Sequence, residues 1–149
     1  MKKYILDLRV RETVKVSGKH VLLKLTYDSK LPEMVPGQFV EVRIDGSATT
    51  MLRRPISINF VDYAANELWL LVAAVGDGTR WLAEGVKAGD VVNCVLPLGN
   101  GFTMPESADE KFLLVGGGVG VAPLLYMGER IKAMGGEPTF LLGARTKND

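Results

Sequence analysis

The sequence has few of the side chains that most catalytic and metal sites require. Its 149 residues include one cysteine, Cys94, and one histidine, His20. A disulfide framework is therefore excluded, as are a zinc site of the Cys/His type and any nucleophile–histidine pair that does not use His20. We expect Cys94 to be a core residue and His20 to lie at the surface. A catalytic function would then depend on a bound cofactor.

An excess of one charge and long apolar runs are also missing. The chain has 18 basic and 17 acidic residues, so nothing in its charge favours nucleic acid or acidic lipid as a partner. No apolar run approaches the roughly 18 residues of a membrane span. Asp7 interrupts the segment in which a signal peptide would need an apolar core. We expect a soluble, cytoplasmic protein that binds neither nucleic acid nor membrane.

Alternating apolar and polar residues dominate the first hundred positions. Strands are predicted over residues 4–16, 21–27, 38–44, 53–60, 67–75 and 91–96, with turns rich in glycine and proline between them. One short helix is predicted over residues 79–84, before Gly85. Six strands with so little helix are typical of an antiparallel barrel or sandwich.

The pattern changes after Pro105. A short apolar strand over residues 111–115 leads into the glycine run Gly116–Gly120, a helix is predicted from Val121, and a second strand covers residues 139–142. This order is the first β-α-β unit of a parallel nucleotide-binding sheet. We expect a barrel domain over residues 1–105 and an incomplete α/β domain over 106–149, because one helix cannot cover both faces of such a sheet. The chain is thus expected to be a fragment that ends early.

Three motifs could bind an anion. The run Gly116–Gly120 presents backbone N–H groups and a helix start, although it departs from the G-x-G-x-x-G pattern and could be a simple tight turn. Gly76–Thr79 leads into the short helix and, taken alone, is more typical of an ordinary helix cap with a glycine turn. Arg53–Ser57 contains two arginines, which suit phosphate but could also be solvated loop residues.

In this order and at this spacing, the three motifs resemble those of the ferredoxin reductase family. The segment Pro36–Val40 is similar to an early barrel strand of the same family. The resemblance implies a six-stranded antiparallel Greek-key barrel that binds FAD, followed by an α/β domain that binds a nicotinamide dinucleotide.

One branch of the family is most similar, on the segments Leu52–Ile58, Gly78–Leu82, Pro97–Phe102 and Gly116–Leu124. It comprises the electron-transfer subunits of class B dihydroorotate dehydrogenase. Membership would imply electron transfer in pyrimidine biosynthesis, from an FMN-containing catalytic subunit through a [2Fe–2S] cluster to FAD and then NAD, within a heterotetramer. The relatives hold this cluster with four cysteines, and Cys94 alone cannot. We expect an incomplete NAD site and at most weak diaphorase activity from the fragment.

The resemblance assigns cofactor contacts within the arginine motif. Arg54 would contact the FAD pyrophosphate, and Ser57 would reach the flavin N5 region. Pro55 and Ile56, between them, would lie against the cofactor. Many relatives have a tyrosine at the position of Ile56, and its replacement removes an aromatic stack from the flavin while matching the dihydroorotate branch.

Further contacts are implied on one strand and in the two glycine turns, and none of these residues is expected to be catalytic. The strand residues along the flavin would be Leu71, Val72 and Ala73. A phosphate would be received by Gly78 and Thr79. The nicotinamide dinucleotide would face Gly117, Gly118 and Gly120.

Two other functions stay open. The chain could be the FAD subunit of a sulfhydrogenase or of a ferredoxin:NADP oxidoreductase, which the motifs separate poorly from the dihydroorotate branch. It could instead be a non-enzymatic β-barrel interaction module, which would be colourless. The choice between NAD and NADP is also open, since Arg145 could meet a 2′-phosphate, a ribose or solvent.

Overall fold

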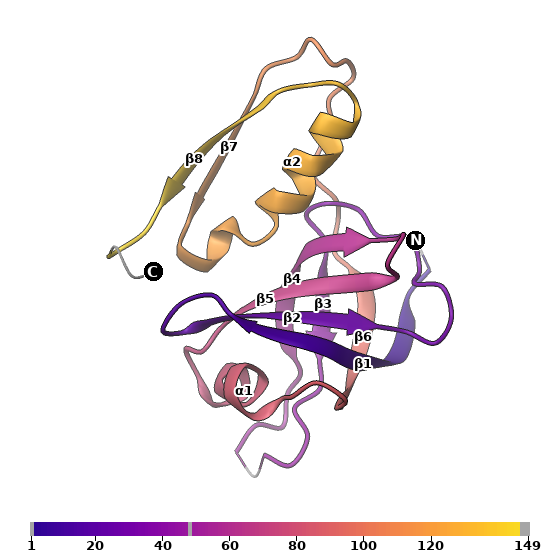
Figure 1. Cartoon of the computed structure of the whole chain (residues 1–149), viewed down its shortest axis with the longest axis vertical. Helices are drawn as coiled ribbons and strands as arrows, with labels where there is room; N and C mark the ends of the chain where they lie inside the picture. Colours follow the sequence, from indigo (N-terminus) through magenta and orange to yellow (C-terminus); the bar gives the residue numbers. More distant parts are fainter. Residues whose placement is uncertain (1, 48, 147–149) are drawn as a thin grey trace.

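A closed barrel of six antiparallel strands forms the larger part of the molecule (Figure 1). The computed structural model describes residues 2–47 and 49–146. Around the barrel the strand order is β1-β2-β5-β4-β3-β6, and every neighbouring pair is antiparallel. The alternation predicted a barrel or a sandwich, and the structure decides for the barrel. Its strands are β1 (Tyr4–Lys15), β2 (His20–Thr26), β3 (Phe39–Val42), β4 (Arg54–Asp62), β5 (Glu67–Ala73) and β6 (Val91–Leu98).

The barrel interior is filled by the apolar half of each alternating strand. Along β5, Leu68, Leu70 and Val72 are fully buried, whereas Leu71 points to the outside and is half-buried. Burial of side chains of this size stabilises the fold by about 1.5–3 kcal/mol each. Cys94 is fully buried in the same core, as expected.

Strand β6 continues through Pro97, where the sequence predicted an end. Tyr4 of β1 pairs with Leu96, and Phe39 of β3 pairs with Leu98. Pro97 therefore lies beyond the last pair of β6 with β1 and within the register shift of β6 against β3. A proline at such a place removes few ladder hydrogen bonds, because it lacks only its own N–H.

The connection between β5 and β6 contains the helix α1 (Asp77–Arg80), which continues as a π-type turn η1 (Trp81–Gly85). The helix begins two residues earlier than predicted because Thr79 caps it. The Thr79 hydroxyl accepts the N–H groups of Val75 and Gly76 at 3.1 and 3.0 Å, and it donates to the Gly76 carbonyl at 3.1 Å.

The second unit is the expected β-α-β arrangement. Parallel strands β7 (Phe112–Gly117) and β8 (Pro138–Gly143) are joined by the turn η2 (Gly118–Val121) and the helix α2 (Leu124–Ala133). The helix covers one face of the sheet through the cluster of Leu114, Leu124, Met127 and Ile131. Strand β7 extends into the glycine run because its last pairs with β8 use only main-chain atoms.

A bulge in β4 joins the two units. Ile58 pairs with Leu70 and Phe60 pairs with Trp69, so Asn59 is an extra residue on β4. The bulge turns Asn59 and Phe60 away from the barrel interior in succession. Asn59 Nδ2 donates to the Ala122 carbonyl at 2.6 Å, and the Phe60 ring meets the Tyr126 ring edge to face at 5.7 Å.

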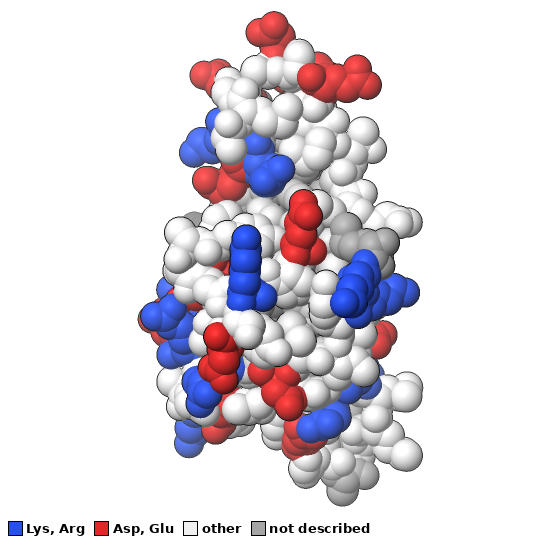
Figure 2. Space-filling model, turned by 90° about the vertical axis from the view of Figure 1, so that its right-hand side faces the viewer, with Lys and Arg blue, Asp and Glu red and all other residues white. Residues whose placement is uncertain are grey.

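Tyr126 adds a second polar contact between the units. Its hydroxyl donates to the Met34 carbonyl at 2.9 Å, and burial raises the pKa of this phenol far above its ordinary value. Acidic and basic side chains are interspersed over the barrel on the face in Figure 2. Within the described ranges, no helix has both the length and the apolar character needed to cross a bilayer.

Candidate functional site

A cavity of about 270 Å³ lies on the outer face of β4 and β5, beneath the turn η2; we call it the β4–β5 cavity. It brings together residues from all three anion-binding motifs of the sequence. The side chains that face outward from β4 and β5 form its floor, and η2 forms its roof. Its lining consists of Pro55, Ile56, Ser57, Leu71, Ala73, Val75, Thr79, Val119, Gly120 and Ala122.

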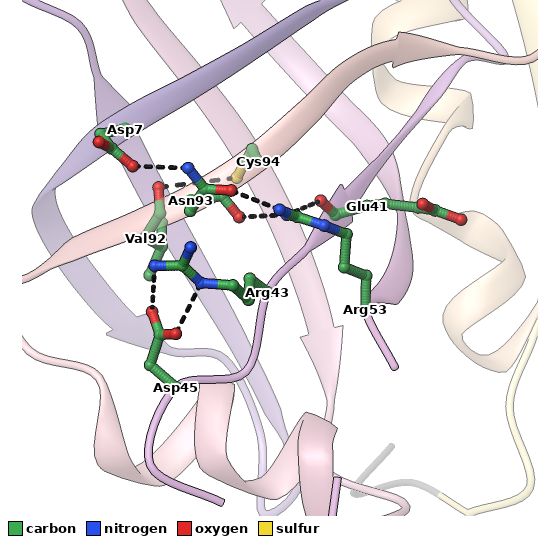
Figure 3. Close-up of polar contacts among 8 residues, drawn as sticks. All are labelled: Asp7, Glu41, Arg43, Asp45, Arg53, Val92, Asn93 and Cys94. Carbon is green, nitrogen blue, oxygen red and sulfur yellow. Dashed lines mark hydrogen bonds and ion pairs between the residues drawn. The ribbon is translucent and has the colours of Figure 1, made fainter. Parts of the chain in front are cut away.

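The two adjacent arginines make different contacts: Arg53 precedes β4, and Arg54 is the first residue of that strand. Arg53 Nη2 donates to Asn93 Oδ1 at 2.6 Å, and Nη1 donates to the Asn93 carbonyl at 3.0 Å and to the Glu41 carbonyl at 3.4 Å (Figure 3). Asn93 Nδ2 in turn donates to Asp7 at 2.7 Å. Arg53 therefore cross-links β3 and β6.

Arg54 is left available for a ligand. Its half-buried side chain lies over Gly78, where an added Cβ would come within 2.8 Å of Arg54 Nε and 3.0 Å of Cγ. Within residues 2–47 and 49–146, its guanidinium makes no hydrogen bond or ion pair. A planar guanidinium without a protein partner, next to a helix start, is suited to binding a phosphate in bidentate fashion.

The residues at the start of α1 offer backbone groups to an anion. Gly78 is buried beneath Arg54, and the first N–H groups of a helix have no partner within the helix. The hydroxyl of Thr79 is already used by the cap, so this residue offers its backbone N–H and its methyl group. Thr79 also lines the β4–β5 cavity.

The three residues assigned along β5 divide between its two faces. Leu71 and Ala73 line the cavity. Val72 is fully buried in the barrel core and does not line the cavity. Ile56 serves both regions, since it packs in the core and lines the cavity.

The glycine turn is shared between two cavities. Gly120 lines the β4–β5 cavity, and Gly118, whose φ of +54° favours glycine, lines a second cavity of about 290 Å³. This second cavity, the hairpin cavity, lies between the β1–β2 turn and the end of β8, and both cavities include Leu71. Gly117 pairs with Gly143 at the end of the parallel sheet and lines neither cavity.

The expectation that His20 lies at the surface is wrong. Only 8% of the residue is exposed, and it lines the hairpin cavity together with Ser17. Ser17 Oγ and His20 Nδ1 are 2.8 Å apart and share a hydrogen bond. Neither residue was a sequence candidate, because a histidine at the first position of a strand gives no periodic signal.

The thiol of Cys94, the one cysteine of the sequence, is unreactive. Burial raises the pKa of the Cys94 thiol to about 12, which keeps it protonated and unreactive. In the part of the chain that the structure describes, no group of three or more His, Cys, Asp or Glu residues could hold a metal ion.

Comparison with curated proteins identifies clear relatives, although no family model matches the chain. The dihydroorotate dehydrogenase B (NAD(+)) electron transfer subunit of Bacillus mycoides is 44% identical over 114 residues, which are 76% of this chain and 44% of that protein. The corresponding subunit of Geobacillus kaustophilus is 35% identical over 144 residues, which are 92% of this chain and 56% of that protein. The chain is a homologue of these electron transfer subunits. It spans about half the length of the curated relatives it matches.

Solved structures with this fold include a cytochrome P450 reductase and a ferredoxin-NADP oxidoreductase. Amycolatopsis cytochrome P450 reductase GcoB superposes with a TM-score of 0.83 at 28% identity, over 98% of this chain and 45% of that one. An NADH-dependent reduced ferredoxin-NADP oxidoreductase superposes with a TM-score of 0.81 at 31% identity, over 95% and 49%. The barrel and the following β-α-β unit thus have the fold of the ferredoxin reductases, as the motifs predicted.

Proposed function

We propose that the chain binds FAD in the β4–β5 cavity and belongs to an electron-transfer flavoprotein. The observation that carries the proposal is the guanidinium of Arg54, which has no partner among the described residues, lies beside Gly78 at the start of α1 and directly precedes Pro55 of the cavity lining. A flavin dinucleotide needs a cation and backbone donors at its pyrophosphate, and a mainly apolar wall at its ring. The residues present fit both requirements.

Each residue has a definite part in this proposal. Arg54 and the N–H groups of Gly78 and Thr79 would hold the pyrophosphate. Ser57 would present its hydroxyl to the reactive edge of the ring, and Leu71 and Ala73, which line the same cavity, would offer apolar contact. When bound, FAD supplies the redox chemistry, and these side chains bind it, orient it and limit the access of water.

Gly118 and Gly120 would meet a nicotinamide dinucleotide at the carboxyl ends of β7 and β8, where ligands bind in open α/β sheets. Gly117 would act through its backbone alone. The names of the homologues support NAD as the electron acceptor and a dihydroorotate dehydrogenase catalytic subunit as the partner. The proposal also includes an FMN in that partner and a [2Fe–2S] cluster outside residues 1–149. It further includes a heterotetramer and a cytoplasmic location.

Reconstitution with FAD tests the cofactor assignment directly. The purified chain should acquire the visible absorbance of bound flavin. Arg54→Ala should weaken FAD binding roughly 10- to 100-fold, because it removes charge-assisted hydrogen bonds of about 1.5–3 kcal/mol. Arg53→Ala is the matched control: it should lower the stability of the barrel and leave FAD affinity nearly unchanged. A colourless wild-type protein, or an Arg54→Ala variant that binds FAD as tightly as wild type, would contradict the assignment.

The partner assignment needs a separate experiment. Co-expression with the dihydroorotate dehydrogenase catalytic subunit of the same source should give a complex that co-elutes in gel filtration. The complex tested is one whose electron-transfer subunit also carries the proposed [2Fe–2S] cluster, and within it dihydroorotate should bleach the bound FAD without oxygen. A chain that elutes alone, with FAD that dihydroorotate does not reduce, would count against this branch of the family.

One specific observation favours a second candidate. The ferredoxin-NADP oxidoreductase structure is 31% identical to this chain over 95% of its length, so a subunit that exchanges electrons with ferredoxin also fits. Reduction of the bound FAD by reduced ferredoxin, but not by dihydroorotate through its dehydrogenase, would favour this candidate.

A further inference from the structure

The hairpin cavity is walled by both units of the molecule. The β1–β2 turn contributes Ser17 and His20, β5 contributes Leu71, η2 contributes Gly118 and Val121, and β8 contributes Leu142. The cavity lies at the carboxyl ends of the two parallel strands, next to the glycine turn. Because it shares Leu71 with the β4–β5 cavity, a ligand here would lie beside a ligand there.

His20 places one polar atom at this cavity. Its Nδ1 is bonded to Ser17 Oγ at 2.8 Å, and Ser17 is itself fixed because its N–H donates to the His20 carbonyl at 3.2 Å. The other ring nitrogen, Nε2, bonds to no residue that the structure describes. The described residues include no fully buried, unpartnered side-chain nitrogen or oxygen, so Nε2 is accessible. His20 is 8% exposed and lines the cavity, so a ligand in the cavity would lie against this residue.

The rest of the lining is largely apolar. Leu71, Val121 and Leu142 present aliphatic surface to the cavity. A pocket with apolar walls and one fixed hydrogen-bonding atom is complementary to a flat ring that carries a single polar substituent. A nicotinamide ring with its carboxamide has this chemistry. The adenosine half of a dinucleotide, which carries a ribose and several ring nitrogens, matches it less well.

We propose that His20, oriented by Ser17, hydrogen-bonds the carboxamide of a nicotinamide ring in the hairpin cavity and so selects the nicotinamide end of the dinucleotide. The inference rests on the proposed function, because that function supplies the dinucleotide that the hairpin cavity, beside the proposed flavin site, would bind. It adds a contact from the barrel itself, from the turn between β1 and β2. The alternation of β2 could not reveal this contact, because the turn meets the glycine run only in the folded molecule.

The test compares two halves of the dinucleotide as ligands of the whole chain. Binding of reduced nicotinamide mononucleotide and of ADP-ribose is measured by ligand-observed NMR titration. His20→Phe keeps the ring volume and removes the nitrogens, so it should weaken mononucleotide binding roughly three- to tenfold. ADP-ribose binding should be unchanged. His20→Gln, which retains a hydrogen-bonding group, should recover most of the lost affinity, and Ser17→Ala should show a smaller loss of the same kind.

Each other result overturns the inference. Wild-type protein that does not bind the mononucleotide, a His20→Phe variant that binds it as wild type does, or equal losses for both probes would each exclude the carboxamide contact. The titration is run with and without FAD, and flavin absorbance reports FAD occupancy separately. Failure of FAD to bind therefore counts against the proposed function, whereas the response of the mononucleotide to His20→Phe decides the role of His20.

Discussion

Replacing Asn59 by leucine should loosen the β-α-β unit from the barrel while the barrel stays folded. Asn59 is 7% exposed, and its Nδ2 lies 2.6 Å from the Ala122 carbonyl, the residue that follows η2. Leucine has a similar volume but no donor, so this carbonyl loses its side-chain partner at a buried position. Leaving one partner of such a bond unsatisfied costs about 1–3 kcal/mol.

The loss of stability should be confined to the β-α-β unit, because the hydrogen bond from Asn59 to Ala122 connects that unit to the barrel and does not hold the barrel core together. Amide hydrogen exchange followed by mass spectrometry resolves the two regions. Exchange in η2 and α2 should accelerate roughly 5- to 100-fold, which corresponds to a loss of 1–3 kcal/mol in the free energy of opening. Exchange in β5, whose inward side chains fill the barrel, should change little.

Asn93→Leu provides the matched control. Asn93 holds Arg53 and Asp7 on the barrel wall, so its replacement should lower barrel stability without selectively releasing α2. Unchanged exchange of α2 in Asn59→Leu would refute the argument that the bulged residue holds the two units together. Equal acceleration of β5 and α2 would refute its locality.

Three other substitutions have defined outcomes. Gly78→Ala should displace Arg54, because the new Cβ would lie 2.8 Å from Nε, and FAD titration should then give weaker binding with little change in the melting temperature. Gly116→Ala should destabilise the β-α-β unit by about 1–3 kcal/mol, since its Cβ would lie 3.1 Å from the Val121 Cα. A variant that unfolds in urea at the same concentration as wild type would contradict this. Cys94, whose pKa rises from 9.0 to about 12 in the fold, contributes stability below pH 9 that is lost as the pH rises toward 12. Cys94→Val should therefore flatten the decline of unfolding free energy over that range, and an equally steep decline would exclude the thiol as a source.

The local sequence could predict the strands because each barrel strand has one face toward the core and one toward the outside, so apolar and polar residues alternate along it. Leu68, Leu70 and Val72 alternate with outward residues, and this spacing by itself gives the face that is buried. The bulge at Asn59 could not be predicted in this way. It resets the phase of β4, so that Ile58 and Val61 both face the core although they are three residues apart. Its cause is the register of β4 against β5 in the folded hairpin, which the alternation within β4 alone does not contain.

The candidate site was predictable in its backbone and less so in its side chains. Glycines and the capping threonine mark the two turns directly, because only certain residues tolerate such geometry. Arg53 and Arg54 are indistinguishable as neighbouring loop residues, and only Asn93, far away in the sequence, shows that Arg53 is structural. The burial of His20 likewise depends on the closeness of the β1–β2 turn to η2 and β8, which no periodic pattern contains.

Strand β4 links these features into one rigid arrangement. Its first half provides Pro55 and Ser57 to the β4–β5 cavity. Its bulge contacts Ala122, which follows η2, through Asn59, and α2 through Phe60. The floor and the roof of the cavity are therefore fixed by the same strand, and the hairpin cavity, which shares Leu71 and the glycine turn, is fixed with them. The proposed flavin and nicotinamide rings would need this kind of preorganised spacing, because a small displacement between reacting groups slows a reaction steeply. A one-residue shift of β4 would change both cavities at once, and the bulge prevents that shift by fixing the register against β5.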